Sequence, residues 1–117
     1  MSTNKNLIFR ELQQATADLT ISKRSDLFET IGEGSVDDLA IDFNNFLHAA
    51  KPYLKLSDRS GLELLIAIDE KLNRISGGEN VELWTVDAFI NNDVWNEIRD
   101  NATIAIKHFR WSNRHAN

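Results

Sequence analysis

Histidine is the side chain best able to transfer protons near neutral pH, and this chain contains three of them: His48, His108 and His115. The sequence has no His-x-x-x-His pair, no Glu-x-x-His motif and no calcium-loop signature. Cysteine is absent, which excludes thiolate ligands and a cysteine nucleophile. Neither pair of glycines is followed by the residues of a phosphate loop. We therefore expect no metal, no cofactor and no catalytic residues, and we interpret the histidines as structural.

One pair of residues allows an alternative. Arg110 and His115 have a spacing that resembles the Arg and His pair of the helical HEPN ribonucleases. That family usually has a polar residue directly after its arginine, whereas Trp111 stands there in this chain. The pair also follows the last helix that the sequence predicts, where contacts to a transition state are hard to hold in place. A HEPN-like ribonuclease is therefore kept as an alternative to our interpretation that the chain is not an enzyme.

Acidic residues are concentrated in two windows that contain no Lys or Arg. Residues 25–47 and 75–98 contain the following acids: Asp26, Glu29, Glu33, Asp37, Asp38, Asp42, then Glu79, Glu82, Asp87, Asp93 and Glu97. Some of these acids are explained as solvating or helix-capping residues, but most protein surfaces mix the two signs. A surface of one sign speeds encounter with a partner of the opposite sign. The pattern therefore predicts a basic protein partner.

The predicted partner-binding residues come from both windows. They are Glu29, Glu33, Asp37, Asp38, Asp42, Glu82, Trp84 and Asp87. Trp84 lies among acids, where it is either an exposed anchor for the partner or a lid that packs onto the bundle. The net charge of −5 argues against direct binding of nucleic acid, which needs a cationic surface. We expect a monomer or a homodimer.

The composition is typical of one folded domain. The chain has 117 residues, of which 42% are hydrophobic and 26% are charged, and this length allows a core without metal or disulfide support. We expect a single helical domain over residues 1–117. The N-terminal sequence lacks the apolar segment of a signal peptide, and no apolar run has the length of a membrane span. Together with the lack of cysteine, this predicts a cytoplasmic protein with no membrane association.

Apolar residues at helical spacing predict four principal helices. The most apolar is the central helix, residues 57–78, with Ser57 or Ser60 as its N-cap and Gly77-Gly78 at its end. The other three are expected from Thr3 or Asn4 to Leu19, from Ser35 to about Ala50, where Pro52 ends or kinks the helix, and from Asn92 or Asp93 to about Trp111. Short helices are expected at residues 26–31 and 86–91.

The remaining segments are predicted to be irregular. Residues 53–56 are expected to form an apolar connector, and residues 79–84 an extended linker, since Val81 and Leu83 alternate without a strand to pair with. The fold class is all-α, a compact antiparallel bundle of four principal helices plus one or two short helices. An α+β domain is the alternative if the apolar run at residues 62–68 is a strand.

The small, acidic, cysteine-free helical chain is similar in kind to bacterial immunity proteins. Residues 82–89 and 95–99 resemble helical segments in small proteins of contact-dependent inhibition and related toxin systems. The chain lacks the adjacent tyrosine pair of the colicin DNase immunity proteins and has Tyr53 alone. The resemblance implies that the protein masks a cognate basic nuclease toxin. The alternative outside this class is a helical regulatory or scaffold module that acts by homo-oligomerisation.

Overall fold

Helices make up nearly all of the described chain. The computed structural model describes residues 2–21 and 35–111. Its elements are α1 (Ser2–Asp18), α2 (Ser35–Ser57), α3 (Arg59–Arg74), the 3-10 helix η2 (Gly78–Trp84), α4 (Val86–Asn91) and α5 (Asp93–Phe109). These residues contain no β-strand, so the all-α prediction is confirmed and the strand at residues 62–68 is wrong. None of the helices found in them is long and apolar enough to cross a membrane.

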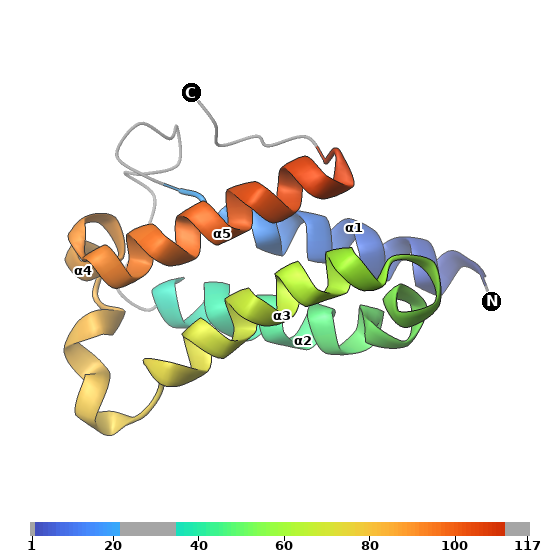
Figure 1. Cartoon of the computed structure of the whole chain (residues 1–117). Helices are drawn as coiled ribbons and strands as arrows, with labels where there is room; N and C mark the ends of the chain where they lie inside the picture. The colour runs from blue at the N-terminus through green and yellow to red at the C-terminus, as the bar shows by residue number, and fades with distance from the viewer. Residues whose placement is uncertain (1, 22–34, 112–117) are drawn as a thin grey trace.

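The four long helices form an antiparallel bundle. α1, α2, α3 and α5 alternate in direction along the chain, and α1 packs on α2, α2 on α3, α3 on α5, and α5 back on α1 (Figure 1). α4 and η2 lie together at one end, beside the end of α3 and the start of α5 (Figure 1). The predicted short helix at residues 86–91 is confirmed, and the one predicted at residues 26–31 falls outside the described residues.

The core follows the predicted apolar stripes. In α3 the side chains of Leu62, Leu65, Ile68 and Leu72 are buried, because this helix contacts both α2 and α5. Leu7, which the sequence assigns to the inner stripe of α1, is instead half exposed. α1 also begins at Ser2, ahead of the predicted caps at residues 3 and 4.

Pro52 does not end the second long helix. α2 continues through Pro52 to Ser57, so the predicted connector at residues 53–56 is helical. Proline removes the backbone N–H that would bond to the carbonyl of His48. Both His48 and Pro52 are exposed, so water can bond to the His48 carbonyl. The helix therefore tolerates the loss of this one backbone hydrogen bond.

The N-cap of α3 is Asp58 and not the predicted Ser57 or Ser60. The Asp58 carboxylate accepts a hydrogen bond of 2.9 Å from the backbone N–H of Gly61. Ser57 is already used by the preceding helix, since its hydroxyl donates to the carbonyl of Tyr53 at 2.9 Å. The helix also ends earlier than the sequence predicts, with its C-cap at Ile75, two residues before Gly77.

Residues 78–84 form a 3-10 helix with a kink at Asn80, so the predicted extended linker is wrong. Two indole groups fold this segment back onto the bundle. Trp84 Nε1 donates to the carbonyl of Ile75 at 2.7 Å, and Trp95 Nε1 donates to the carbonyl of Leu83 at 2.6 Å. Gly77 allows the sharp reversal before η2, because its φ of 112° lies in the region that favours glycine.

Candidate functional site

A groove of about 530 Å³ opens where α2, the end of α3 and η2 meet. Its polar residues are Asp37, Asn44, Asn45, Asp69, Asn73 and Ser76. Its apolar residues are Ala40, Ile41, Leu72, Val81 and Trp84, and Gly77 and Gly78 complete it. No Lys or Arg occurs among the described residues that line it. The groove therefore combines negative charge, amide groups and apolar surface.

The groove brings together two of the predicted partner-binding residues, one from each acidic window. Asp37 comes from the start of α2, and Trp84 comes from the end of η2. Asp38 and Asp42 are exposed on α2 but do not line the groove. The two acidic windows therefore approach each other at this end of the bundle.

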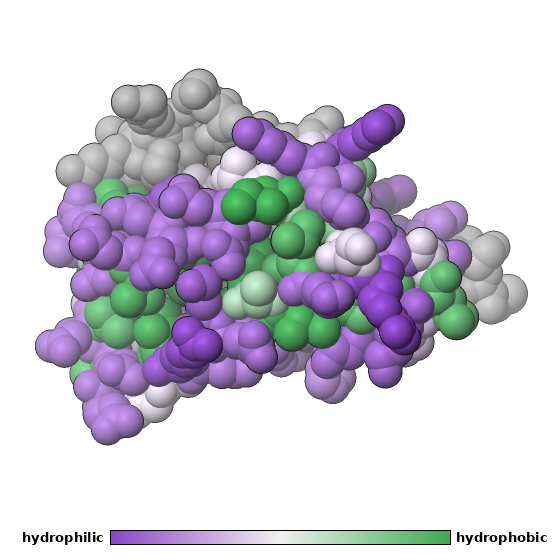
Figure 2. Space-filling view, in the orientation of Figure 1, coloured by the Kyte–Doolittle hydropathy of each residue, from purple (hydrophilic) through white to green (hydrophobic). Residues whose placement is uncertain are grey.

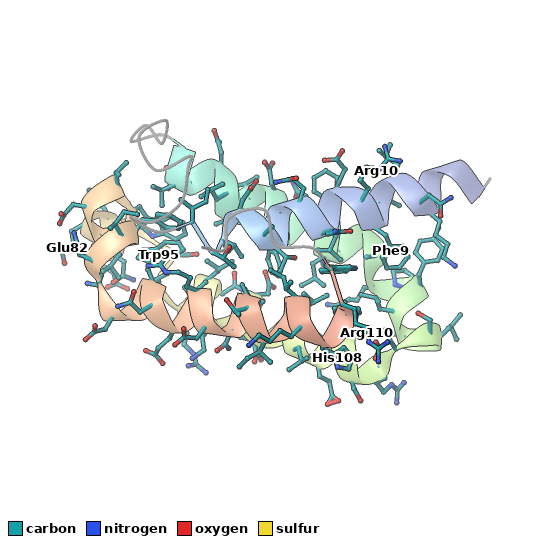
Figure 3. All side chains as sticks on the ribbon, turned by 90° about the horizontal axis from the view of Figure 1, so that it is seen from above. Phe9, Arg10, Glu82, Trp95, His108 and Arg110 are labelled. Carbon is teal, nitrogen blue, oxygen red and sulfur yellow. The ribbon has the colours of Figure 1, made fainter. Side chains whose placement is uncertain are left out.

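Two further predicted residues, Glu82 and Asp87, lie outside the groove. Glu82 is exposed on η2 and projects away from the bundle at the end where α4 lies, whereas Trp95 points inward (Figure 3). Asp87 is exposed in the first turn of α4, where its carboxylate accepts a hydrogen bond of 3.0 Å from the Asn91 amide. Glu29 and Glu33 fall outside the described residues.

Several groove residues were not predicted from the sequence. On α2, Ile41 and Asn44 follow Asp37 at intervals of four and three residues. The same intervals separate Asp69 and Asn73 on α3 and Ser76 just after the C-cap of that helix. Residues at these spacings share one face of a helix. The sequence therefore showed that each set of residues shares a helix face. It did not show that the face on α2 and the face on α3 meet.

Asp69 is held in place by a neighbouring helix. The amide Nδ2 of Asn44 on α2 donates to Asp69 Oδ1 on α3 at 2.9 Å. The C-terminal end of α3, which is the negative end of the helix dipole, lines the same groove. Both features favour a positively charged group in the groove.

Trp84 has the structural role that the sequence offered as one of two alternatives, and it also lines the groove. Its indole is half buried, and its ring packs edge-on against Trp95 with centroids 5.2 Å apart. The hydrogen bond from its Nε1 to the carbonyl of Ile75 joins η2 to the end of α3. Trp84 thus fixes the wall of the groove that η2 provides.

Beside this groove lies the α4–α5 corner, which we define by Trp95, Arg99 and Phe89. Trp95 is 0% exposed, and its ring packs edge-on against Phe89 with centroids 5.1 Å apart. Arg99 Nη1 donates to the carbonyl of Ile21 at 2.9 Å, and Nη2 donates to the carbonyl of Phe89 at 3.1 Å. Burial lowers the pKa of the Arg99 guanidinium, and the Asp100 carboxylate opposes that shift. The charge of Arg99 serves the fold and does not belong to a free basic surface.

At the opposite end of α3, Asp58 is paired with a histidine of α5. His108 Nε2 lies 2.9 Å from Asp58 Oδ2, so the N-cap of α3 is joined to the last turn of α5. The hydrogen bond from Gly61 N–H, with a smaller contribution from His108, lowers the pKa of the Asp58 carboxyl. This arrangement accounts for His108 as a structural residue.

The predicted HEPN-like pair is described in part. Arg110 is exposed and follows α5 in the left-handed conformation, with φ of 60°. Its backbone N–H and that of Trp111 cap the carbonyls of Lys107 and Ile106. Trp111 stacks on Phe109 with centroids 4.4 Å apart. His115 falls outside the described residues, so the pair remains a prediction.

A second surface feature follows the seam between α3 and α5. Apolar residues gather there on the face seen in Figure 2, between polar residues on both sides. The pairs Lys71–Glu97 and Asp58–His108 join the two helices along this seam. Ile104 is 53% exposed, close to the 54% of Ile41 in the groove. The seam carries charges of both signs, in contrast to the groove.

The described residues contain no group of three or more His, Asp or Glu side chains that could hold a metal ion. In comparisons with known proteins, no family model, no curated protein and no solved structure matches this chain.

Proposed function

We propose that this chain is an acidic binding protein that masks a basic protein partner, and specifically that it is an immunity protein that neutralises a nuclease toxin in the bacterial cytosol. The observation that carries the proposal is the groove where the two acidic windows meet. Asp37 and Asp69 line it together with apolar side chains, and no described Lys or Arg lines it. A groove with apolar surface and charge of one sign is suited to an interface with a partner of opposite charge.

Masking requires no catalytic group. A bound protein that covers the active site of a nuclease, or a surface beside it, prevents access of nucleic acid. The exposed acids Asp38 and Asp42 lie on the same helix as Asp37 and extend the negative surface beyond the groove. This extended charge would steer a basic partner before the groove makes close contact.

The test is inhibition of a captured partner. The protein is used to isolate a basic partner from its native host, and the activity of that partner, with nuclease activity assayed first, is measured at increasing concentrations of the protein. We expect inhibition that saturates at a fixed stoichiometry. Reversal of charge at Asp37, Asp38 and Asp42 to Lys should slow association by at least about tenfold at low salt, and raised salt should slow association of the wild type.

The matched control reverses three exposed acids elsewhere, Glu63, Asp93 and Asp100. Like Asp37 and Asp38, Asp93 lies in the first turn of its helix, so both triple variants lose a favourable interaction with a helix dipole. Equal slowing by the two variants, or a bound partner whose activity is unchanged, would contradict the proposal.

A further inference from the structure

The amide side chains of the groove indicate the form of its ligand. Asn45 and Asn73 line the groove, and their side chains have no hydrogen-bond partner within residues 2–21 and 35–111. Each amide offers both donor and acceptor groups. Asn44 differs, because it donates to Asp69. The groove therefore exposes two unused amides along two different helices, α2 and α3.

An extended peptide is better matched to these amides than a helix. The backbone groups of a helix are bonded within the helix, apart from its ends. An extended segment exposes N–H and C=O groups along its whole length, and a binding site gains affinity by pairing with them. Asn45 and Asn73 can each pair with both kinds of group.

The apolar lining specifies one kind of side chain on the ligand. Ile41 on α2 is 54% exposed and Val81 on η2 is 70% exposed, while Leu72 between their elements is buried at 4% exposure. An aliphatic side chain placed against Ile41 and Val81 would remove the exposed surfaces of these two side chains from water. The size of the groove, about 530 Å³, allows such a side chain together with part of the peptide backbone.

The charge of the groove specifies the neighbouring residues of the ligand. Asp37 and Asp69 line it, and the negative end of the α3 dipole is close to Asn73 and Ser76. Residues two apart in an extended segment lie on the same side of it. Lys or Arg within two residues of the aliphatic anchor can therefore reach these carboxylates.

We propose that the groove binds an extended segment of the partner protein in which an aliphatic residue is flanked within two positions by Lys or Arg. This inference rests on the proposed function, since it names the part of the partner that is bound. Asp37 and Asp69 bind the cations, Ile41 and Val81 bind the aliphatic anchor, and Asn45 and Asn73 bind the peptide backbone.

The test uses a phage-displayed library of random peptides, selected on the wild-type protein and depleted on the Ile41→Arg variant. We expect enriched peptides to contain Ile, Leu or Val with Lys or Arg within two positions, and to accept proline nearby, which a helical ligand would not. One enriched peptide is then synthesised, and its affinity is measured by fluorescence polarisation.

Matched variants assign that affinity to the groove. Ile41→Arg should weaken binding by at least about tenfold, which corresponds to about 1.4 kcal/mol. Asp37→Asn and the double variant Asn45→Ala/Asn73→Ala should each weaken it by about three- to tenfold. Ile104→Arg changes an equally exposed isoleucine on the α3–α5 seam and should alter the affinity by less than about twofold. Circular dichroism confirms that each variant is folded.

The inference is overturned by enrichment of acidic peptides, by enrichment of apolar residues at helical spacing without proline, by no enrichment at all, or by equal weakening in Ile104→Arg. Its failure is distinct from failure of the proposed function. If the Ile41→Arg variant still inhibits a native partner, the peptide-binding inference is wrong, but the proposal that the protein masks its partner still holds. If peptides bind as expected but the activity of the partner is never inhibited, the proposed masking function is wrong and the groove is still a peptide-binding site.

Discussion

The groove and the α4–α5 corner are adjacent, yet they differ in whether their polar side chains have hydrogen-bond partners. In the corner, the Trp95 indole and the Arg99 guanidinium are bonded to main-chain carbonyls of residues 83, 21 and 89. In the groove, Asn45 and Asn73 have no side-chain partner among the described residues. The polar groups of the corner therefore hold the fold together, whereas Asn45 and Asn73 of the groove remain available to a ligand.

This contrast separates residues that the sequence alone groups together. Glu82, Trp84, Asp87 and Trp95 all belong to the second acidic window, but only Trp84 lines the groove. Burial and hydrogen bonding, and not residue type, distinguish a structural polar residue from one that can bind. We therefore expect substitutions in the corner to lower stability strongly, and substitutions in the groove to lower it only slightly.

The largest effect is expected from Trp95→Ala. Trp95 is fully buried and contacts both Trp84 and Phe89, so the substitution leaves a large cavity and removes the hydrogen bond to Leu83. We expect the free energy of unfolding to fall by about 3–5 kcal/mol, measured by urea denaturation. Trp84→Ala changes a half-buried position and should lower the free energy of unfolding by clearly less than Trp95→Ala. Equal losses would show that the corner is not the more strongly stabilised region.

A smaller effect is expected from Arg99→Met. The variant keeps an apolar chain of similar length but leaves the carbonyls of Ile21 and Phe89 without their donor. We expect a loss of about 1–3 kcal/mol in the free energy of unfolding, because acceptors that lose their partner in a part-buried site are costly.

Two controls sharpen this second prediction. Arg10→Met replaces an exposed arginine of α1, and Asn45→Ala removes a free amide of the groove; each should change stability by less than about 0.5 kcal/mol. If Asn45→Ala were as costly as Arg99→Met, the groove amides would be structural and the contrast between the two regions would not hold.

The fold was predictable because its long helices carry regular apolar stripes. Leu62, Leu65, Ile68 and Leu72 have helical spacing and are buried in α3. The errors arose where one local signal competed with tertiary contacts. Pro52 indicated an end to α2, but its exposed position makes the lost hydrogen bond tolerable. The alternation of Val81 and Leu83 indicated an extended segment, but the indole groups of Trp84 and Trp95 hold it as a 3-10 helix.

The candidate site was predictable only in part, for a different reason. Asp37 was identified from the absence of nearby Lys and Arg, which is a local property of the sequence. Asp69 was not, because residues around it include Lys71 and Arg74, and its position opposite Asn44 depends on how α2 and α3 pack. A site formed between helices cannot be assembled from the charge of separate windows.

The smallest effect is expected from Asp58, a surface carboxylate whose hydrogen bonds are satisfied as fully as those in the corner. The folded state holds its pKa below the ordinary value of 3.8, chiefly through the Gly61 N–H and then through His108. The resulting stabilisation is fully present above the ordinary value and is lost as the pH falls below it and through the lower pKa of the folded state. Asp58→Asn keeps an oxygen for the Gly61 N–H but has no carboxyl group to titrate.

Urea denaturation from about pH 6 to about pH 3 therefore provides the measurement, since other carboxylates titrate equally in both proteins. The wild type should lose more stability over this range than Asp58→Asn, and the difference between them should narrow as the pH falls. The effect of Asp58→Asn on stability should also be smaller than that of Arg99→Met. Asp58 is partly open to solvent and its asparagine variant keeps an acceptor for Gly61, whereas Arg99→Met removes the donor from two carbonyls. Parallel pH profiles for the two proteins would mean that the hydrogen bond of the Asp58 cap stabilises the helix and its charge does not. In that case, the charge of a hydrogen-bonded side chain would stabilise this bundle only where the side chain is buried.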